Sequence, residues 1–160
     1  MQLSSVSPSL LSVASSWKTI RSELLPLISS AFAPWPEKAL YDNSWTVFGI
    51  IHAGFPLPTG TCLCPQTYNL LKDIPNIYTA GFSKLAPKTT IFPHRGNNIP
   101  PKYRCHLGLI VPEHCSFTIN NQTMQWQEGQ WLCFDDADEH SATNQSSSDR
   151  IVLLVDILKS

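Results

Sequence analysis

Residues 77–112 read IYTAGFSKLAPKTTIFPHRGNNIPPKYRCHLGLIVP, and this stretch decides which fold the chain adopts. Runs rich in β-branched, aromatic and other apolar residues occupy positions 77–86, 89–94 and 104–112. Turn residues separate them, Ala-Pro after the first run and Gly-Asn-Asn after the second. Short apolar runs divided by turn signals predict a series of β-strands.

The same pattern of short apolar runs separated by turn residues continues to the end of the chain. Further candidate strands occupy positions 115–121, 123–129, 130–136, 140–145 and 150–158. Turn signals such as Asn-Asn, Glu-Gly and Ser-Ser-Ser lie between them. Many short strands at nearly regular intervals indicate a sandwich or barrel. A jelly roll, in which two sheets pack face to face, is the most economical arrangement.

The N-terminal part has a different periodicity. Between residues 10 and 32 apolar side chains recur every three or four positions, which predicts one or two amphipathic helices. Residues 1–9 are expected to be flexible. We therefore expect one domain, mainly β, in which a helical segment at 1–44 packs on a β core at 45–160. Within that core, 45–53 reads as a buried strand, 55–65 as a loop and 66–74 as a helix.

Composition narrows the function classes. The 160 residues are 42% hydrophobic and 14% charged, with a formal net charge of −1, so neither nucleic acid nor an anionic membrane is expected as a partner. An odd count of 5 cysteines argues against a complete disulfide framework and for free thiols. No signal-peptide pattern or apolar run of ~18 residues is present, so we expect a soluble cytoplasmic protein of unknown oligomeric state.

Two histidines stand at the ends of predicted strands. His94 precedes the Gly-Asn-Asn turn, and His140 follows the acidic run FDDADE. A jelly roll can bring two such strand ends together, and two neutral imidazoles can hold a divalent metal with open coordination sites. The competing interpretation for His94 alone is a surface histidine at a turn. Asp136 or Asp138, both close to His140 in sequence, is an alternative metal ligand.

Two arginines have patterns that call for a partner. Arg150 opens the apolar run IVLLV and so faces a core, where a guanidinium needs an anion. A carboxylate ligand would satisfy it through two parallel hydrogen bonds. Arg104 is two residues from His106, so both side chains share one face of a strand.

Several motifs occur together in this order. They are Cys-Pro at 64–65, LLKDIPNI at 70–77, FSKLAP at 82–87, PHRG at 93–96, RCHLGL at 104–109, W-x-x-G at 126–129, FDD-x-x-x-H at 134–140, and Arg150 before an apolar strand. This combination resembles the aspartyl/asparaginyl β-hydroxylase family over about residues 45–156. Members of that family are iron(II)- and 2-oxoglutarate-dependent oxygenases on a double-stranded β-helix, a cupin-like variant of the jelly roll.

The resemblance implies a role for each matching residue. His94 and His140 would bind iron(II). The family lacks the usual carboxylate ligand, and Gly96 stands at that position here, with water in its place. The remaining implied contacts concern carboxylates: Arg150 and Ser83 would bind the distal carboxylate of 2-oxoglutarate, His106 the carboxylate nearer the metal, and Arg104 a cosubstrate or substrate carboxylate. Arg95 lies near the proposed mouth, where it either meets an acidic substrate or is a solvated rim residue.

The implied function is a dioxygenase that uses O2 and 2-oxoglutarate to hydroxylate an unactivated C–H bond, with succinate and CO2 as co-products. The expected target is the β-carbon of an aspartyl or asparaginyl residue in a short peptide, or of a related small amino acid. Two alternatives are a fatty-acyl hydroxylase of the same family and a non-catalytic cupin-like module that binds a metal or ligand. Arg150 with Ser83 favours an enzyme, because a plain metal-binding module has no need of a carboxylate clamp.

Overall fold

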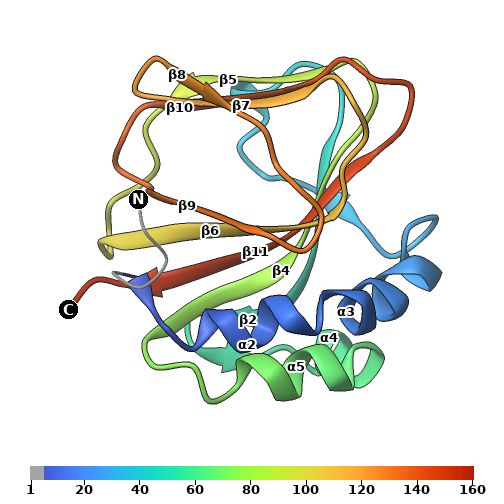
Figure 1. Cartoon of the computed structure of the whole chain (residues 1–160), viewed down its shortest axis with the longest axis vertical. Coiled ribbons are helices and arrows are strands. Elements are labelled where there is room, and N and C mark those ends of the chain that lie inside the picture. Colours follow the sequence, from blue (N-terminus) through green and yellow to red (C-terminus); the bar gives the residue numbers. More distant parts are fainter. Residues whose placement is uncertain (1–5) are drawn as a thin grey trace.

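The computed structural model describes residues 6–160, and in this part of the chain two antiparallel sheets face each other with helices on one outer side. Figure 1 shows the smaller sheet at the top, the larger sheet across the middle and the helices beneath it. Together with the alternating burial along the strands, this arrangement confirms the predicted class of a mainly β, cupin-like jelly roll with N-terminal helices.

The larger sheet has seven strands and lies between the smaller sheet and the helices. Its path runs β1-β2-β4-β11-β6-β9, with β3 paired to β2. The strands are β1 (Ala33–Pro34), β2 (Trp45–His52), β3 (Phe55–Pro56), β4 (Ile77–Leu85), β6 (Lys102–Ile110), β9 (Trp131–Asp135) and β11 (Arg150–Leu158). The C-terminal strand β11 is therefore central, hydrogen-bonded to β4 on one side and β6 on the other.

The smaller sheet has four strands in the order β5-β10-β7-β8. They are β5 (Thr89–His94), β7 (Cys115–Ile119), β8 (Gln122–Met124) and β10 (His140–Asn144). In the register of β5 with β10, His94 is the partner of His140. Antiparallel pairing thus brings together the two strand ends that the sequence predicted to meet.

Short helices cover the outer face of the larger sheet (Figure 1). They are α2 (Leu10–Ser15), α3 (Trp17–Leu24), α4 (Pro58–Leu63) and α5 (Pro65–Leu71), with the 3-10 turn η1 (Leu25–Leu27). A second 3-10 turn, η2 (Lys38–Leu40), lies beside β5 of the smaller sheet. The carboxylate of Glu23 on α3 accepts hydrogen bonds from the first backbone amides of α5, at 3.0 Å from Gln66 N and 2.7 Å from Thr67 N. This cap from another helix ties α5 to α3.

Three local expectations were wrong. Residues 55–65 are not a loop, because Pro58 occupies the first position of a helix, where its fixed φ is favourable. The strand expected at 123–129 is only the short β8, and Trp126 lies beyond its end. Of the expected flexible N-terminus, Val6 packs against the core and Ser7 is buried, while residues 1–5 lie outside the described part.

Two apolar cores fill the spaces between the three layers. One lies between the helices and the larger sheet, and the other lies between the two sheets. Strand β11 serves both, because successive side chains point to opposite faces. Ile151, Leu153 and Val155 join the helical core, whereas Val152 joins the inter-sheet core. The alternation places Arg150 on the same face as Val152, toward the smaller sheet.

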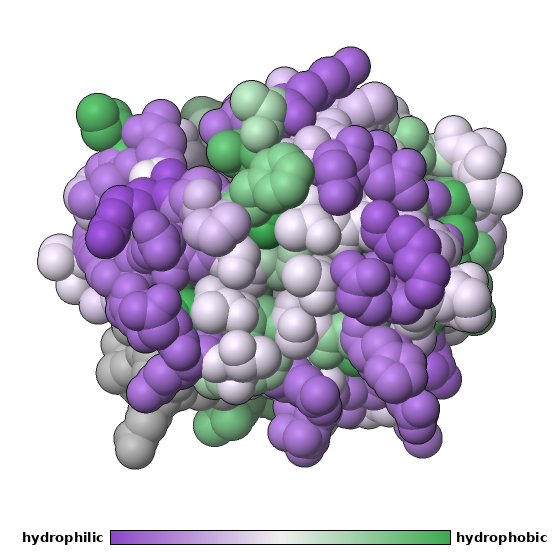
Figure 2. Space-filling model, turned by 90° about the horizontal axis from the view of Figure 1, so that it is seen from above, coloured by the Kyte–Doolittle hydropathy of each residue, from purple (hydrophilic) through white to green (hydrophobic). Residues whose placement is uncertain are grey.

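The outer face of the smaller sheet is uncharged along its strands. Ser116 is hydrogen-bonded to Thr143, and Thr118 to Thr123, between neighbouring strands. Seen from this side, pale and green residues form a central band bordered by hydrophilic ones (Figure 2). Across residues 6–160, none of the helices combines the length and the apolar character needed to cross a membrane.

Candidate active site

A narrow pocket lies between the two sheets and gathers most of the residues singled out from the sequence. Its lining comprises Trp45, Ser83, Ile91, His94, Arg104, His106, Phe117, Phe134, His140, Ser141, Ala142, Arg150 and Leu154. The smaller sheet supplies the two strand-end histidines, and the larger sheet supplies the arginines, Ser83 and His106. The pocket therefore depends on correct stacking of the two sheets.

The rings of His94 and His140 are neighbours, with 4.4 Å between their centroids. Each ring donates from Nδ1 to a backbone carbonyl two residues earlier, His94 to Phe92 O and His140 to Asp138 O, both at 2.7 Å. Because a carbonyl oxygen only accepts, both Nδ1 atoms carry the proton and both Nε2 lone pairs are left free. Such a backbone acceptor is the usual device that orients a metal-binding imidazole.

Burial keeps His140 uncharged. Desolvation lowers the pKa of His140 to about 4, and His94 and Arg104 add to this lowering, while the Asp138 carbonyl and Asp136 oppose it. The ring is 6% exposed. A neutral imidazole is the form that binds a metal ion.

Asp136 brings a carboxylate beside this pair. It is 1% exposed, its Oδ1 atom lies 3.9 Å from His140 Nε2, and Oδ1 has no hydrogen-bond partner. A Cβ atom added at Gly96 would overlap this carboxylate. Gly96 therefore leaves the room that the Asp136 side chain occupies. By contrast Asp138 contributes its backbone carbonyl to His140, not its side chain.

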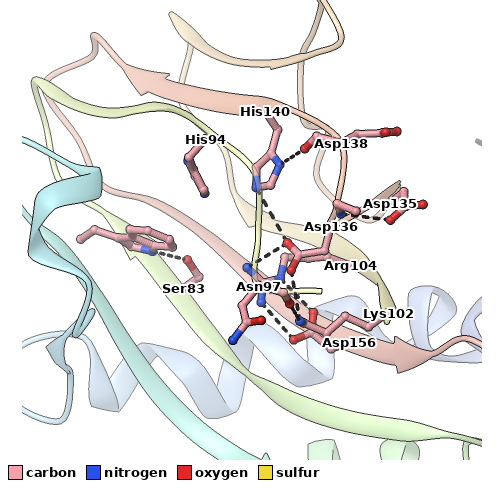
Figure 3. A network of polar contacts seen from close by, with 12 residues as sticks. Ser83, His94, Asn97, Lys102, Arg104, Asp135, Asp136, Asp138, His140 and Asp156 are labelled. Atoms are coloured by element: carbon pink, nitrogen blue, oxygen red, sulfur yellow. Dashed lines mark hydrogen bonds and ion pairs between the residues drawn. The ribbon is translucent and has the colours of Figure 1, made fainter. Parts of the chain in front are cut away.

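A charged network continues from Asp136 across the inner face of the larger sheet (Figure 3). Lys102 Nζ lies 3.2 Å from Asp136 Oδ2, and Arg104 Nη1 lies 3.6 Å from Asp136 Oδ1. Arg104 also donates to Asp156 through Nε at 2.8 Å and Nη2 at 3.0 Å. Burial alone would lower the pKa of Arg104, but the paired Asp156 raises it overall, so this guanidinium stays charged.

Among the residues that the structure describes, no carboxylate pairs with Arg150. Its side chain is 1% exposed, and Nη2 lies 3.3 Å from both the Ser83 carbonyl and the Ser83 hydroxyl. The guanidinium stacks 4.5 Å from the ring centroid of Trp126. Trp45 Nε1 donates to Ser83 Oγ at 2.9 Å and so fixes that hydroxyl. Desolvation lowers the pKa of Arg150 to about 10, which still leaves it protonated near pH 7.

His106 has a defined tautomer as well. Trp126 Nε1 donates to His106 Nδ1 at 3.1 Å, so Nδ1 is the acceptor and the proton is on Nε2. Burial, followed by the nearby Arg150, Arg104 and His140, lowers the pKa of His106 well below its usual value. His106 is therefore a neutral N–H donor lining the pocket.

The fold brings together six of the seven residues expected to form the site: Ser83, His94, Arg104, His106, His140 and Arg150 all line this pocket. Arg95 does not line it; its side chain is exposed and donates to Ala137 O at 3.0 Å. Asp156, Trp126 and Trp45 were not expected as site residues. Only Asp156 had a usable signal, because a charge inside the apolar run RIVLLVDIL needs a buried partner.

The residues present fit a divalent metal ion. Within the described range no three His, Cys, Asp or Glu side chains converge as a ready-made metal site. His94 and His140 offer two imidazoles with free Nε2 lone pairs. Asp136 adds a carboxylate oxygen, Oδ1, which accepts no hydrogen bond and lies close to His140. This donor set suits a metal with two protein nitrogen ligands and several open positions.

Fold and site define a class: a cupin-like jelly roll with a two-histidine pocket and a buried arginine beside it. Among solved structures, the fold is similar to a predicted oxalate decarboxylase from Thermotoga maritima, at TM-score 0.55, 14% identity, and coverage of 82% of this chain and 96% of that one. It is also similar to an ethanolamine utilization protein from Salmonella typhimurium, at TM-score 0.51, 11% identity, and coverage of 81% and 80%. These likenesses concern the fold alone.

The chain belongs to the aspartyl/asparaginyl β-hydroxylase family, whose profile matches residues 14–160. An ornithine lipid ester-linked acyl 2-hydroxylase from Rhizobium tropici is 39% identical, over 74% of this chain and 43% of that protein. The human aspartyl/asparaginyl beta-hydroxylase is 32% identical, over 91% of this chain and 20% of that protein. The chain thus spans less than half the length of these relatives. The family predicted from the motifs is confirmed.

The role of the hydrogen bond from Trp126 Nε1 to His106 Nδ1 can be tested by removing its donor, the indole N–H. In Trp126→Phe the buried Nδ1 of His106 loses its partner, so we expect both neutral tautomers of His106 and a loss of about 1–3 kcal/mol in the free energy of unfolding. Two-bond 15N–1H correlation spectra report the tautomer directly. Trp131→Phe is the matched control, since Trp131 Nε1 donates to Leu10 O far from His106. A single, unchanged His106 tautomer in Trp126→Phe would contradict this role.

The lowered pKa of His140 makes the stability of the folded protein depend on pH. The pKa of His140 is about 4 in the folded protein and 6.5 in its unperturbed state, so between these values the unfolded chain binds more protons. The free energy of unfolding of the metal-free protein should therefore decrease as pH falls from about 6.5 to 4, by roughly 3 kcal/mol for this residue. Urea unfolding at several pH values measures it. The slope should become smaller in His140→Gln but not in His114→Asn, which alters an exposed histidine.

Proposed function

We propose that this protein is an iron(II)- and 2-oxoglutarate-dependent dioxygenase that hydroxylates an unactivated C–H bond. Family membership supports a hydroxylase. The cofactor and cosubstrate are inferred from the pocket: two adjacent imidazoles for the metal, of which burial keeps His140 neutral, and a buried cation for a dicarboxylate. Iron bound by His94 and His140 would supply the activation of dioxygen.

The observation that carries the proposal is the state of Arg150. In the described part of the chain this guanidinium forms no ion pair with any aspartate or glutamate, and its buried Nε has no hydrogen-bond partner. Burying an unpaired charge costs several kcal/mol. An anionic ligand would remove that cost by accepting two parallel hydrogen bonds. The distal carboxylate of 2-oxoglutarate has the required charge and geometry, and Ser83 Oγ would add a third contact.

Other residues orient the same ligand. His106 presents its Nε2–H to the pocket, where it would donate to the second carboxylate. Phe117 and Phe134 pack around His140, with ring centroids at 6.0 and 4.8 Å. These aromatic walls keep water away from His140, which would protect a reactive centre from side reactions. The side chains of this chain would thus bind and orient 2-oxoglutarate and shield the metal site from water.

The named relatives act on different targets. The human relative is named for aspartyl and asparaginyl residues, and the Rhizobium relative for an ester-linked acyl chain. Hydroxylation of a C–H bond is common to both names, and it is the reaction we propose for this chain. The alternative of a non-catalytic metal-binding module does not account for Arg150, because such a module gains nothing from an uncompensated buried cation.

The metal ligands can be tested by two substitutions. His94→Ala and His140→Ala should each lose stoichiometric iron(II) binding and all 2-oxoglutarate-dependent succinate formation, because each removes one of two protein ligands. Anaerobic titration with iron(II) and 2-oxoglutarate, followed by the visible charge-transfer band, reports binding without turnover. His114→Asn is the control and should behave like the native protein. A native band in either alanine variant would show that this histidine is not a required ligand.

The cosubstrate contact is tested at Arg150. Arg150→Lys keeps the charge but removes the two-pronged contact, and a charge-assisted hydrogen bond contributes about 1.5–3 kcal/mol. We therefore expect the half-saturating 2-oxoglutarate concentration to rise by about tenfold to a hundredfold, measured by the same band. Arg95→Lys, on the exposed surface, is the control. Unchanged 2-oxoglutarate affinity in a folded Arg150→Lys variant would assign this arginine to structure alone.

A further inference from the structure

The 125–130 segment connects β8 to β9 and carries Trp126, which contacts two groups of the candidate active site. Trp126 stacks on the Arg150 guanidinium at 4.5 Å and donates to His106 Nδ1 at 3.1 Å. Trp126 is also the only buried residue of this segment, which forms neither a helix nor a strand. An exposed connection of this kind has little packing of its own, so its position must come from the elements beside it.

Strand β6, which carries His106, is one support of the 125–130 segment. Gly129 N donates to Gly108 O at 2.9 Å, and Gly108 N donates to Gln130 O at 3.2 Å. A Cβ atom at Gly108 would overlap the carbonyl oxygen of Gln127. The backbones of the segment and of β6 are therefore in direct contact.

The second support is the indole of Trp17, the first residue of α3. A Cβ atom at Gly129 would lie 2.7 Å from Trp17 Nε1 and 2.9 Å from Trp17 Cδ1, so the indole rests directly on the glycine. Trp17 also packs against the core between the helices and the larger sheet, and the Arg21 guanidinium lies 4.7 Å from the centroid of its ring. The indole is thus fixed by its own helix and core on the side of α3.

An ion pair joins the same two elements, but it is the weaker link. Arg21 Nη1 lies 3.8 Å from Glu128 Oε1, and the two side chains are 34% and 40% exposed. Ion pairs with this exposure contribute little, because water and salt screen them. The close packing of Trp17 on Gly129 is not screened, so we take it as the contact that holds the segment.

We propose that Trp17 is a positioning residue for the active site: its contact with Gly129 holds the 125–130 segment where Trp126 reaches both Arg150 and His106. Trp126 is three residues from Gly129, so a shift of the glycine moves the indole that serves both groups. A misplacement of about 1 Å is enough to impair a site of this kind. The inference rests on the proposed function only where it concerns 2-oxoglutarate at Arg150.

Trp17→Leu tests this role, because it keeps an apolar side chain in the helical core but removes the indole from Gly129. We expect His106 to populate both neutral tautomers, as measured by two-bond 15N–1H spectra of the metal-free protein. The half-saturating 2-oxoglutarate concentration, measured by the charge-transfer band, should rise about threefold to thirtyfold, the range for residues that act on a ligand through another residue. Trp17→Phe keeps a flat ring in place and should retain most of both native properties.

Ile20→Val is the matched control, since Ile20 is a fully buried residue of the same helix and its truncation lowers stability modestly. Arg21→Gln removes the exposed ion pair. Both variants should keep a single His106 tautomer and native 2-oxoglutarate affinity. A native tautomer and native affinity in folded Trp17→Leu would overturn the proposal. Equal changes in Ile20→Val would overturn it too, because they would indicate a general loss of packing.

Gly129→Ala approaches the same contact from the other side and decides the question if Trp17→Leu does not fold. Its methyl group would collide with Trp17 Nε1 and would require a positive φ from alanine, so it should displace the 125–130 segment. We expect mixed His106 tautomers here as well. A single native tautomer together with native 2-oxoglutarate affinity in Gly129→Ala would contradict the positioning role.

The two measurements separate this proposal from the function on which it partly rests. A native protein without any charge-transfer band contradicts the proposed dioxygenase, yet the His106 tautomer of Trp17→Leu still tests the position of Trp126. A native band with no change of either property in Trp17→Leu contradicts the positioning role alone. Mixed tautomers with native 2-oxoglutarate affinity would support the link to His106 and overturn the link to Arg150.

Discussion

The burial of the Arg150 guanidinium without a carboxylate is the constraint on which the rest of the site depends. Within residues 6–160 this group has the Ser83 oxygens and the face of Trp126 as its partners. Most proteins avoid such a placement, because the desolvation of a cation is costly unless a counterion repays it. A bound anion would offset this desolvation cost. Such a local conflict between burial and charge is typical of a binding site rather than of a structural core.

Arg150 is also connected to the other functional groups through one residue. Trp126 stacks on the guanidinium and donates to His106, so a single indole sets the position of a cation and the tautomer of a neutral donor. The W-x-x-G motif continues into Gly129, which has φ +79 and approaches Trp17 so closely that a Cβ would collide with its indole. The turn after Trp126 therefore needs a glycine at position 129, both for its positive φ and for the close approach of Trp17 from α3.

Much of this arrangement could be predicted from the sequence, because strand periodicity and motif order are local properties. His94 and His140 at strand ends, and Arg150 at the start of an apolar strand, follow from alternation and burial. The contacts of Arg104 could not be predicted in the same way. They depend on the register of β6 with β11, in which Arg104 is the partner of Asp156. Register is fixed by the packing of whole sheets, and no short motif specifies it.

Strand β11 shows why the two halves of the site differ in charge. Positions 150 and 156 are on the same face of this strand, separated by Val152 and Leu154. At one end Arg150 pairs with no carboxylate of the described residues, so this end attracts an anion. At the other end Asp156 neutralises Arg104. The proposed carboxylate site therefore lies at the Arg150 end of β11. The alternation of side chains along this strand puts Arg150 and Asp156 on the same face but two alternate positions, Val152 and Leu154, apart, so the Arg104–Asp156 pair does not neutralise Arg150.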